Sequence, residues 1–205
     1  MKLTTTMFLT LDGVYQAPGA PDEDTSDGFD QGGWQYPYLD QVMGEVIDQW
    51  FAGADAFLLG RRTYEIFAAY WPLHNDPDNP IATKLNELPK YVASRQDLQP
   101  GWRHSSVLRG QLSDAVTELK SRPGRELQVH GSGALVRALH DLGLIDEYRM
   151  LISPVVLGAG KRLFGGGSAP SALRLVRSRT TSTGSIAAEY QPAGQPTYGS
   201  IPDGG

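Results

Sequence analysis

The chain contains no cysteine, so it can form neither disulfide bonds nor thiolate-bound metal centres. It also lacks an excess of positive charge, because 18 Lys and Arg face 23 Asp and Glu, which gives a net charge of −5. Nucleic acids are bound by clustered Lys and Arg. We therefore expect no nucleic-acid partner, and the lack of cysteine fits a reducing compartment.

Long hydrophobic runs are missing as well. No stretch approaches the roughly 20 apolar residues that a membrane-spanning helix needs. The first residues, MKLTTTMFLTLDG, have neither the apolar core nor the cleavage site of a signal peptide. The four histidines form no close pair, with one another or with a carboxylate, at helical spacing. These absences predict a cytoplasmic protein with no membrane partner and no bound metal.

The composition is otherwise ordinary for a globular protein. The chain has 205 residues, of which 40% are hydrophobic and 20% are charged. This length is typical of one domain with a sizeable core. We expect that domain over 1–191, followed by a Gly-, Pro- and Ser-rich disordered tail over 192–205.

Strand and helix patterns alternate along the domain. We expect strands at 2–11, 54–59, 90–94, 105–110, 126–131 and 146–158, the last with a bend at Pro154. We expect helices at 39–51, 62–70, 81–88, 114–120 (capped by Ser113) and 133–143, with Gly53 and Gly143 closing two of them. The final strands, 172–180 and 184–192, should pair antiparallel. This order predicts a three-layer α/β fold, with a mixed, mostly parallel sheet, an antiparallel C-terminal edge and helices on both faces.

Residues 16–38 form a long loop that is rich in Gly, Pro and acidic residues. Loops of this length in compact domains are usually functional lids or disordered segments. Aromatic residues are scarce in disordered segments. The aromatic residues of 16–38, among them Phe29 and Trp34, therefore favour a lid.

Polar residues and glycines gather where three of the expected strands end. Gly60-Arg61-Arg62-Thr63 follows the strand at 54–59, Ser94-Arg95 ends the next, and Gly131-Ser132-Gly133-Ala134 follows LQVH. Ligands of open α/β sheets bind at the carboxyl ends of the strands, where helix N-termini, glycines and arginines hold phosphate groups. Together the turns predict a ligand with several phosphates, such as a dinucleotide.

Simpler alternatives account for each turn taken alone. They are solvated arginines, an ordinary Ser-Arg turn and a tight glycine turn at a helix start. The G-x-G-x-x-G dinucleotide fingerprint is incomplete, because Val136 stands at its third glycine. A hydrolase nucleophile at Ser132 has little support, because His130 stands where the nucleophile elbow requires glycine.

The chain resembles the dihydrofolate reductase-like superfamily, and more closely the reductase domain of the bifunctional riboflavin-pathway deaminase/reductase. The resemblance lies in FLTLDGV (8–14), LLGRRTYE (58–65), YVAS (91–94), VHGSGALVRAL (129–139) and ISPVVLGAGKRLF (152–164), which occur in the family's order. It implies a single reductase-type domain, an NADPH cofactor and a homodimer. The zinc signature of the deaminase domain needs cysteine, so this chain does not carry that activity.

The resemblance also implies roles for individual residues. The adenosine side of NADPH and its 2′-phosphate fall to Gly60, Arg61, Thr63, Ser94 and Arg95. The pyrophosphate falls to Gly131, Ser132, Gly133, Ala134 and Leu135. The nicotinamide and substrate side falls to Phe8, Thr10, Asp12 and Trp34.

Other assignments stay open at this point. Lys161 and Arg162 either hold a phosphorylated substrate or belong to a surface loop or a dimer contact. Asp40, Glu45 and Asp48 are either counterparts of the acid that binds pterin in dihydrofolate reductase or solvated side chains.

The sequence and the resemblance together favour an NADPH-dependent reductase. It would transfer a hydride to a small heterocycle that is like 5-amino-6-(5-phosphoribosylamino)uracil or like a pterin. Ordered water and Asp12 are the candidate proton donors. The alternatives are a non-catalytic protein that binds a nucleotide or small ligand on the same fold, and an interaction module that binds no nucleotide.

Overall fold

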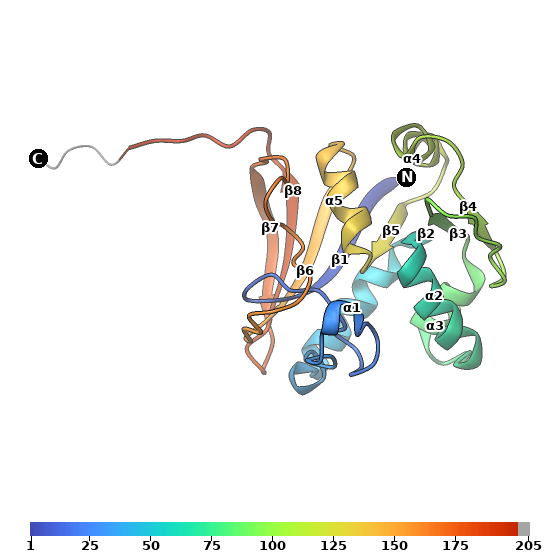
Figure 1. The fold of residues 1–205 in the computed structure, drawn as a ribbon, viewed down its shortest axis with the longest axis horizontal. Coiled ribbons are helices and arrows are strands. Elements are labelled where there is room, and N and C mark those ends of the chain that lie inside the picture. The colour runs from blue at the N-terminus through green and yellow to red at the C-terminus, as the bar shows by residue number, and fades with distance from the viewer. Residues whose placement is uncertain (201–205) are drawn as a thin grey trace, which may run out of the picture.

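The computed structural model describes residues 1–200, which form one eight-stranded sheet with the order β4-β3-β2-β5-β1-β6-β8-β7. The strands are β1 (Lys2–Thr10), β2 (Ala54–Gly60), β3 (Lys90–Ala93), β4 (Ser105–Val107), β5 (Glu126–His130), β6 (Glu147–Ser153), β7 (Leu173–Thr180) and β8 (Ile186–Pro192). The pairs among β1 to β6 are parallel, whereas β8 runs antiparallel to β6 and β7 (Figure 1). The predicted mixed sheet with an antiparallel C-terminal edge is therefore confirmed.

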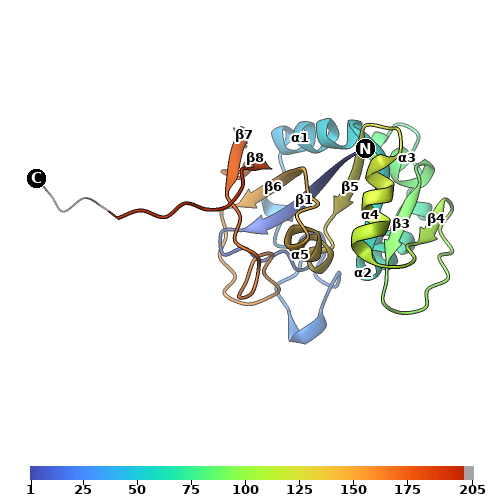
Figure 2. The same ribbon diagram turned by 90° about the horizontal axis from the view of Figure 1, so that it is seen from above.

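Helices cover both faces of this sheet, as predicted. They are α1 (Gln41–Ala52), α2 (Arg61–Tyr70), α3 (Pro80–Glu87), α4 (Leu112–Ser121) and α5 (Gly133–Asp141). On one face, Leu119 of α4 and Leu139 of α5 belong to the same core cluster as Leu3 of β1. On the other face, Phe51 of α1 and Leu85 of α3 pack in a second cluster with residues of β2. Figure 2 shows α1 and α5 on opposite sides of β1 and β6.

Three local predictions were wrong, each for a physical reason. The strand expected over 146–158 ends at Ser153, because Pro154 has no N–H for the ladder. The strand expected over 105–110 ends at Val107, ahead of Gly110, whose φ is +80°. The fourth helix begins at Leu112 after Gln111 rather than at a Ser113 cap, and Leu112 packs against the core.

The 16–38 segment folds around a small apolar cluster of its own. Val14, Ala17, Phe29 and Trp34 are buried together. The Trp34 indole N–H donates to the backbone oxygen of Gln16 at 2.8 Å. The segment holds two short 3₁₀ turns, η1 (Ser26–Gly28) and η2 (Tyr36–Tyr38). This packing gives the loop a defined shape, and its role as a lid stays a prediction.

The C-terminal end of the domain extends slightly past β8. The N–H of Ala193 donates to the oxygen of Ala172 at 2.8 Å, and the N–H of Ala172 donates to the oxygen of Gly194 at 2.9 Å. The expected boundary at 191 and the disordered tail stay predictions. Residues 201–205 of that tail lie outside the described residues.

Candidate functional site

Two of the three polar turns meet at the carboxyl ends of the central strands. The N–H of Gly60, which ends β2, donates to Ser132 Oγ at 3.0 Å. The N–H of Ser132 donates in turn to Thr63 Oγ1, on the first turn of α2, at 3.1 Å. Thr63 also lies under Gly131, where an added Cβ would be 3.7 Å from its side chain. The turns after β2 and β5 therefore form one continuous surface.

The turn after β5 has the backbone geometry of an anion-binding site. Gly131 and Ser132 both take left-handed conformations, with φ of +55° and +56°, and α5 follows at once. Ser132 makes no side-chain cap to the helix. Among residues 1–200, the backbone N–H groups of Gly133, Ala134 and Leu135 donate to no hydrogen-bond acceptor. Consecutive free N–H groups at a helix N-terminus are suited to a phosphate or carboxylate.

The third turn lies beside this surface without joining it. Ala93 of β3 pairs with Gly60 of β2, so Ser94 and Arg95 also lie at the carboxyl ends of the parallel strands. Ser94 Oγ accepts from the N–H of Gln96 at 3.1 Å and donates to the oxygen of Gln96 at 2.8 Å. Arg95 is exposed. The Ser94 hydroxyl is thus engaged in its own turn, and the Arg95 guanidinium is accessible to a ligand.

The two arginines after β2 point to different partners. Arg61 pairs with Glu65, one turn further along α2, at 2.7 Å. Arg62 pairs with Asp24 of the 16–38 segment at 3.0 Å. Both guanidiniums remain partly exposed. Both arginines belong to the turn expected to bind phosphate, and the resemblance gave a cofactor role by name to Arg61 alone. Arg62 is the arginine that contacts the 16–38 segment.

The predicted substrate-side residues are engaged inside the protein. Thr10 Oγ1 donates to Asp12 at 2.5 Å and accepts from the N–H of Val14 at 2.9 Å. Asp12 also accepts from the N–H of Gly158 at 2.9 Å and pairs with Arg162 at 3.0 Å. The hydrogen bond from Thr10 and these contacts hold the pKa of Asp12 well below its usual range. Asp12 is therefore an ionised structural carboxylate and a poor proton donor.

Phe8 and Trp34 join the loop to the sheet. Phe8 packs against the cluster beneath α1 and against the cluster of the 16–38 segment. Trp34 is buried in the latter cluster, with 7% of its surface exposed. Among the predicted substrate-side residues, these two hold the loop in place.

Tyr15 is a residue that sequence reasoning missed. Its ring lies directly on the backbone of Gly133, where an added Cβ would be 2.3 Å from Tyr15 Cζ. Burial raises the pKa of the Tyr15 hydroxyl, which also feels the charges of Arg137, Asp24 and Arg62. Only glycine at 133 permits this contact. The Tyr-Gln pair that follows LDGV in the sequence was the available signal.

The hydrolase alternative for Ser132 has no catalytic base. Ser132 Oγ donates to the backbone oxygen of His130 at 3.2 Å. The His130 ring is stacked on Phe51 at 4.2 Å, and its Nε2 lies 2.9 Å from Gln128 Oε1. Burial, reinforced by the charge of Arg149, lowers the pKa of His130 to about 3. His130 is a satisfied core histidine, as its simpler interpretation predicted.

The acids offered by the helix after the loop lie elsewhere. Asp40 caps α1 by accepting from the N–H of Met43 at 2.7 Å. Glu45 pairs with Arg179 of β7 at 2.8 Å. Asp48 is exposed. Their interpretation as surface or capping side chains fits these positions.

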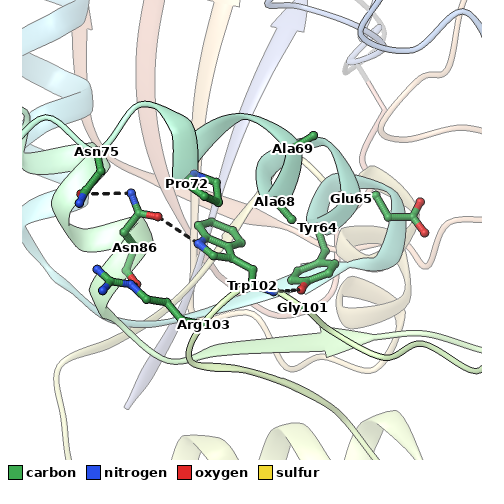
Figure 3. Close-up of a pocket in the computed structure, with 10 residues that line it drawn as sticks. All are labelled: Tyr64, Glu65, Ala68, Ala69, Pro72, Asn75, Asn86, Gly101, Trp102 and Arg103. Carbon is green, nitrogen blue, oxygen red and sulfur yellow. Dashed lines mark hydrogen bonds between the residues drawn. The ribbon is translucent and has the colours of Figure 1, made fainter.

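A large open groove lies on the far side of α2 (Figure 3). It has a volume of about 750 Å³ and is lined by Tyr64, Glu65 and Ala68 of α2 and by Trp102. At 3.6 residues per turn, these positions lie about 100° to 200° around the helix from Thr63. The groove is therefore separate from the surface around Ser132. The polar groups of Trp102 and Tyr64 in this groove already have partners. The Trp102 indole N–H donates to Asn86 Oδ1 at 3.0 Å, and the Tyr64 hydroxyl accepts from the backbone N–H of Trp102 at 3.1 Å.

Within residues 1–200, no helix is long and apolar enough to cross a membrane. The same residues hold no cluster of three or more His, Asp or Glu side chains that could bind a metal ion.

The topology and the glycine-rich turn define the class of the protein. A mostly parallel sheet with an antiparallel C-terminal pair, and with a glycine-rich turn before α5, is the dihydrofolate reductase-like fold. The model of the RibD C-terminal domain family matches residues 1–187. The chain belongs to this family, which is reductase-like.

Known proteins agree with this assignment. YyaP of Bacillus subtilis (strain 168), described as uncharacterized, is 30% identical over 173 residues, covering 81% of this chain and 89% of YyaP. A putative riboflavin biosynthesis protein from Shewanella sp. PV-4 has a similar structure, with a TM-score of 0.64 and 21% identity over 94% of this chain and 99% of its own.

A pyrimidine reductase-like protein from Corynebacterium diphtheriae superposes with a TM-score of 0.61 and 16% identity, covering 94% of this chain and 92% of its own. RibD of Acinetobacter baumannii gives 0.58 and 14%, covering 94% of this chain and 58% of RibD. At these identities the solved structures establish the fold.

Proposed function

We propose that the protein is an NADPH-dependent reductase of a small heterocyclic substrate. The observation that carries the proposal is the glycine-rich turn, where three adjacent backbone N–H groups have no acceptor within residues 1–200. The turn lies at the carboxyl ends of the central strands, beside the cationic first turn of α2. The donor set fits a pyrophosphate, because N-terminal N–H groups and guanidiniums both favour phosphate oxygens.

The residues of the turns after β2, β3 and β5 divide between the two halves of the cofactor. Gly131, Ser132, Gly133, Ala134 and Leu135 would hold the pyrophosphate. Gly60 and Thr63 keep that turn in shape through Ser132. Arg61, Ser94 and Arg95 would hold the adenosine side and its 2′-phosphate. The bound cofactor supplies a hydride, and the protein supplies orientation and electrostatics.

The substrate would lie where β1 and the 16–38 segment meet. Phe8 and Trp34 would form an apolar wall there, while Thr10 and Asp12 keep the β1 turn rigid. Because Asp12 is held as a carboxylate, we favour ordered water as the proton donor. The names of the Corynebacterium and Shewanella proteins support a pyrimidine of riboflavin biosynthesis as the substrate class, ahead of a pterin.

One observation keeps a second candidate function open. Asp12, Asp24 and Asp40 all spend their carboxylates on ion pairs or helix capping. A fold that keeps the glycine-rich turn while these three acids are engaged also fits a non-catalytic nucleotide-binding protein. Oxidation of bound NADPH by a pyrimidine or pterin substrate separates the two.

The decisive experiment is a calorimetric titration of the protein with NADPH and with NADH, followed by a substrate screen on the saturated complex. We expect micromolar binding of NADPH and much weaker binding of NADH. Absence of binding by either nucleotide would mean that the polar turns are structural and that the proposed function is wrong.

Replacing Arg61 by Ala tests the 2′-phosphate role. We expect a loss of about 1.5–3 kcal/mol in NADPH binding, as for a charge-assisted hydrogen bond, with little change for NADH. The matched control is Arg122→Ala, because Arg122 forms the same kind of i,i+4 ion pair, with Glu118 of α4, outside the proposed cofactor site. An equal loss for both nucleotides would remove Arg61 from the 2′-phosphate site.

We also propose that two copies associate and act in the cytoplasm. The exposed strand β7 supports the association, because seven of its eight residues are solvent-exposed in a single chain. A strand exposed in this way at a sheet edge is a ready surface for pairing or packing.

A further inference from the structure

An acidic side chain from the 16–38 segment lies between two cations near the glycine-rich turn. Asp24 pairs with Arg62 of α2 at 3.0 Å and with Lys161, from the loop after β6, at 2.8 Å. Ser26 Oγ donates to Asp24 at 2.5 Å and accepts from both Arg62 and Lys161. Asp24 thus brings together side chains that are far apart in the sequence.

A buried glutamine, Gln16, holds the backbone of this cluster in place. The Gln16 amide donates to the backbone oxygens of Asp24 and Ser26 at 3.0 Å, and Gln16 Oε1 accepts from the N–H of Lys161 at 3.0 Å. Gln16 is 2% exposed. Only 13% of the Asp24 side chain is exposed. Burial alone would raise the pKa of Asp24, but hydrogen bonds from Lys161 and Ser26 outweigh it and lower the pKa to about 2.

The cluster adjoins the free N–H groups of the turn. Tyr15, the neighbour of Gln16, lies on Gly133 and feels the charges of both Asp24 and Arg62. Arg62 comes two residues after Gly60, which bonds to Ser132. A cavity of about 250 Å³ is lined by Gln16, Ser26 and Lys161 of the same cluster. The two cations are therefore connected to the glycine-rich turn through Tyr15 and Gly60.

We propose that Arg62 and Lys161 form a phosphate subsite that the Asp24 carboxylate occupies as an internal stand-in. A carboxylate and a phosphate present the same kind of acceptor oxygens to guanidinium and ammonium groups. A phosphorylated ligand displaces Asp24, and the 16–38 segment is released from α2 at that moment. This inference rests on the proposed function, because it concerns the same site. We call the contact of Asp24 with Arg62 and Lys161, which the ligand would replace, the gate.

The gate makes a prediction of unusual sign, since removing a charged residue should improve binding. Asp24→Asn keeps the size of the side chain but removes the carboxylate that Arg62 and Lys161 share. The two cations then keep their contacts with Ser26, and Lys161 stays 3.9 Å from Asp27, without a competing buried carboxylate. We expect the dissociation constant for a phosphorylated ligand to fall about 5- to 20-fold, equal to about 1–2 kcal/mol. The control is Asp22→Asn, an exposed acid of the same segment, which reports the general effect of one lost negative charge.

The experiment is a calorimetric titration of the natural chain and both variants with NADPH and, separately, with ribose 5-phosphate. A gain with NADPH assigns the subsite to the cofactor, and a gain with ribose 5-phosphate assigns it to a phosphorylated substrate. Either gain should disappear when Arg62→Gln is added to Asp24→Asn. Equal affinities in Asp24→Asn and Asp22→Asn, or weaker binding in Asp24→Asn, would overturn the proposal.

A second measurement does not depend on how the variants fold. The ¹³C signal of the Asp24 carboxylate in the natural chain should move on titration with the phosphorylated ligand, and that of Asp22 should not. An Asp24 signal that stays unchanged at saturation would overturn the gate.

The outcomes also separate the gate from the reductase activity. If Asp24→Asn binds a phosphorylated ligand more tightly but no substrate oxidises NADPH, the gate stands and the reductase function fails. If NADPH is turned over and Asp24→Asn behaves like Asp22→Asn, the reverse holds.

Discussion

At the scale of single residues, the candidate site depends on hydrogen bonds between Ser132 and two residues, Gly60 and Thr63, of a turn far away in the sequence. Ser132 accepts from Gly60 and donates its N–H to Thr63. The sequence placed each of them at a strand end, and parallel topology brings strand ends together. It could not foresee that the Ser132 hydroxyl would join the two turns by accepting from the N–H of Gly60.

Gly133→Ala tests how closely Tyr15 packs on the turn. The added Cβ would lie 2.3 Å from Tyr15 Cζ, so the ring or the turn must move. We expect the free energy of unfolding to fall by about 1–3 kcal/mol, as for an overpacked site. Chemical denaturation measures the change.

The control for that variant is Gly44→Ala in helix α1, where an added Cβ meets nothing within 4 Å. Alanine is the better helix former, so we expect a gain of about 0.5–1 kcal/mol. If both variants gained stability, the contact between Tyr15 and Gly133 would be wrong.

At the scale of elements, β5 and β6 carry a row of polar side chains beneath α1. Arg149 of β6 is 8% exposed and pairs with Glu126 at 2.7 Å and with Glu147 at 3.0 Å. Gln128 donates to the backbone oxygen of Trp50, at the end of α1, at 2.6 Å. Buried charges of this kind are stable only when they are fully paired. The pairing fixes α1 to the sheet face that the phosphate turn does not use.

The pH dependence of stability tests this region through His130. Its pKa falls from 6.5 to about 3 on folding, mainly by burial, so the folded protein keeps the ring neutral. The unfolded chain binds the proton below pH 6.5, so acidification favours unfolding, and the contribution is flat above that pH. Between pH 6.5 and pH 5 we expect a loss of about 2 kcal/mol from this residue.

His130→Gln should remove that slope, since glutamine does not titrate and can still donate to Gln128. Denaturation curves at pH 5, 6, 7 and 8 give the change of the free energy of unfolding with pH. A destabilisation by altered packing is the same at every pH, so it does not affect this change. If the free energy of unfolding of the variant depends on pH between 5 and 6.5 as strongly as that of the natural chain, a titrating group other than His130 causes the dependence.

Element boundaries show where sequence patterns lose accuracy. Helix α1 was expected from residue 39 and begins at Gln41, because Asp40 accepts from the N–H of Met43 and caps it. Periodicity reports which face is apolar, whereas the first residue of a helix depends on its cap. The ends of β6 and α4 differed for similarly local reasons, a proline and an apolar contact.

At the scale of the whole molecule, the sheet ends in an exposed edge. The side chain of Leu175 in β7 is 50% exposed, and Ile186 of β8 is 42% exposed. On the opposite side of the sheet, β4 is only three residues long. Short edges discourage association. Exposed apolar side chains such as Leu175 and Val176 favour it, so β7 is the edge that we expect a second copy to cover.

Leu175→Asp tests that association. Placing a charge in an apolar contact should halve the molecular mass measured by analytical ultracentrifugation. Leu73→Asp is the control, because Leu73 is 81% exposed and lies after α2, beyond the other half of the sheet. A natural chain that is monomeric at all concentrations would contradict the proposed homodimer.

The sequence by itself determined the α/β class, the order of the elements, the polar strand ends and the resemblance to a reductase family. These follow from short-range signals, namely periodicity, turn residues and contiguous motifs. Only the tertiary structure decided which side chains are free. It engaged Asp12 with Arg162, placed Tyr15 on Gly133 and set Asp24 between Arg62 and Lys161. Those contacts join segments that are tens of residues or more apart, and no local pattern specifies which of several charged neighbours will meet once the chain has folded.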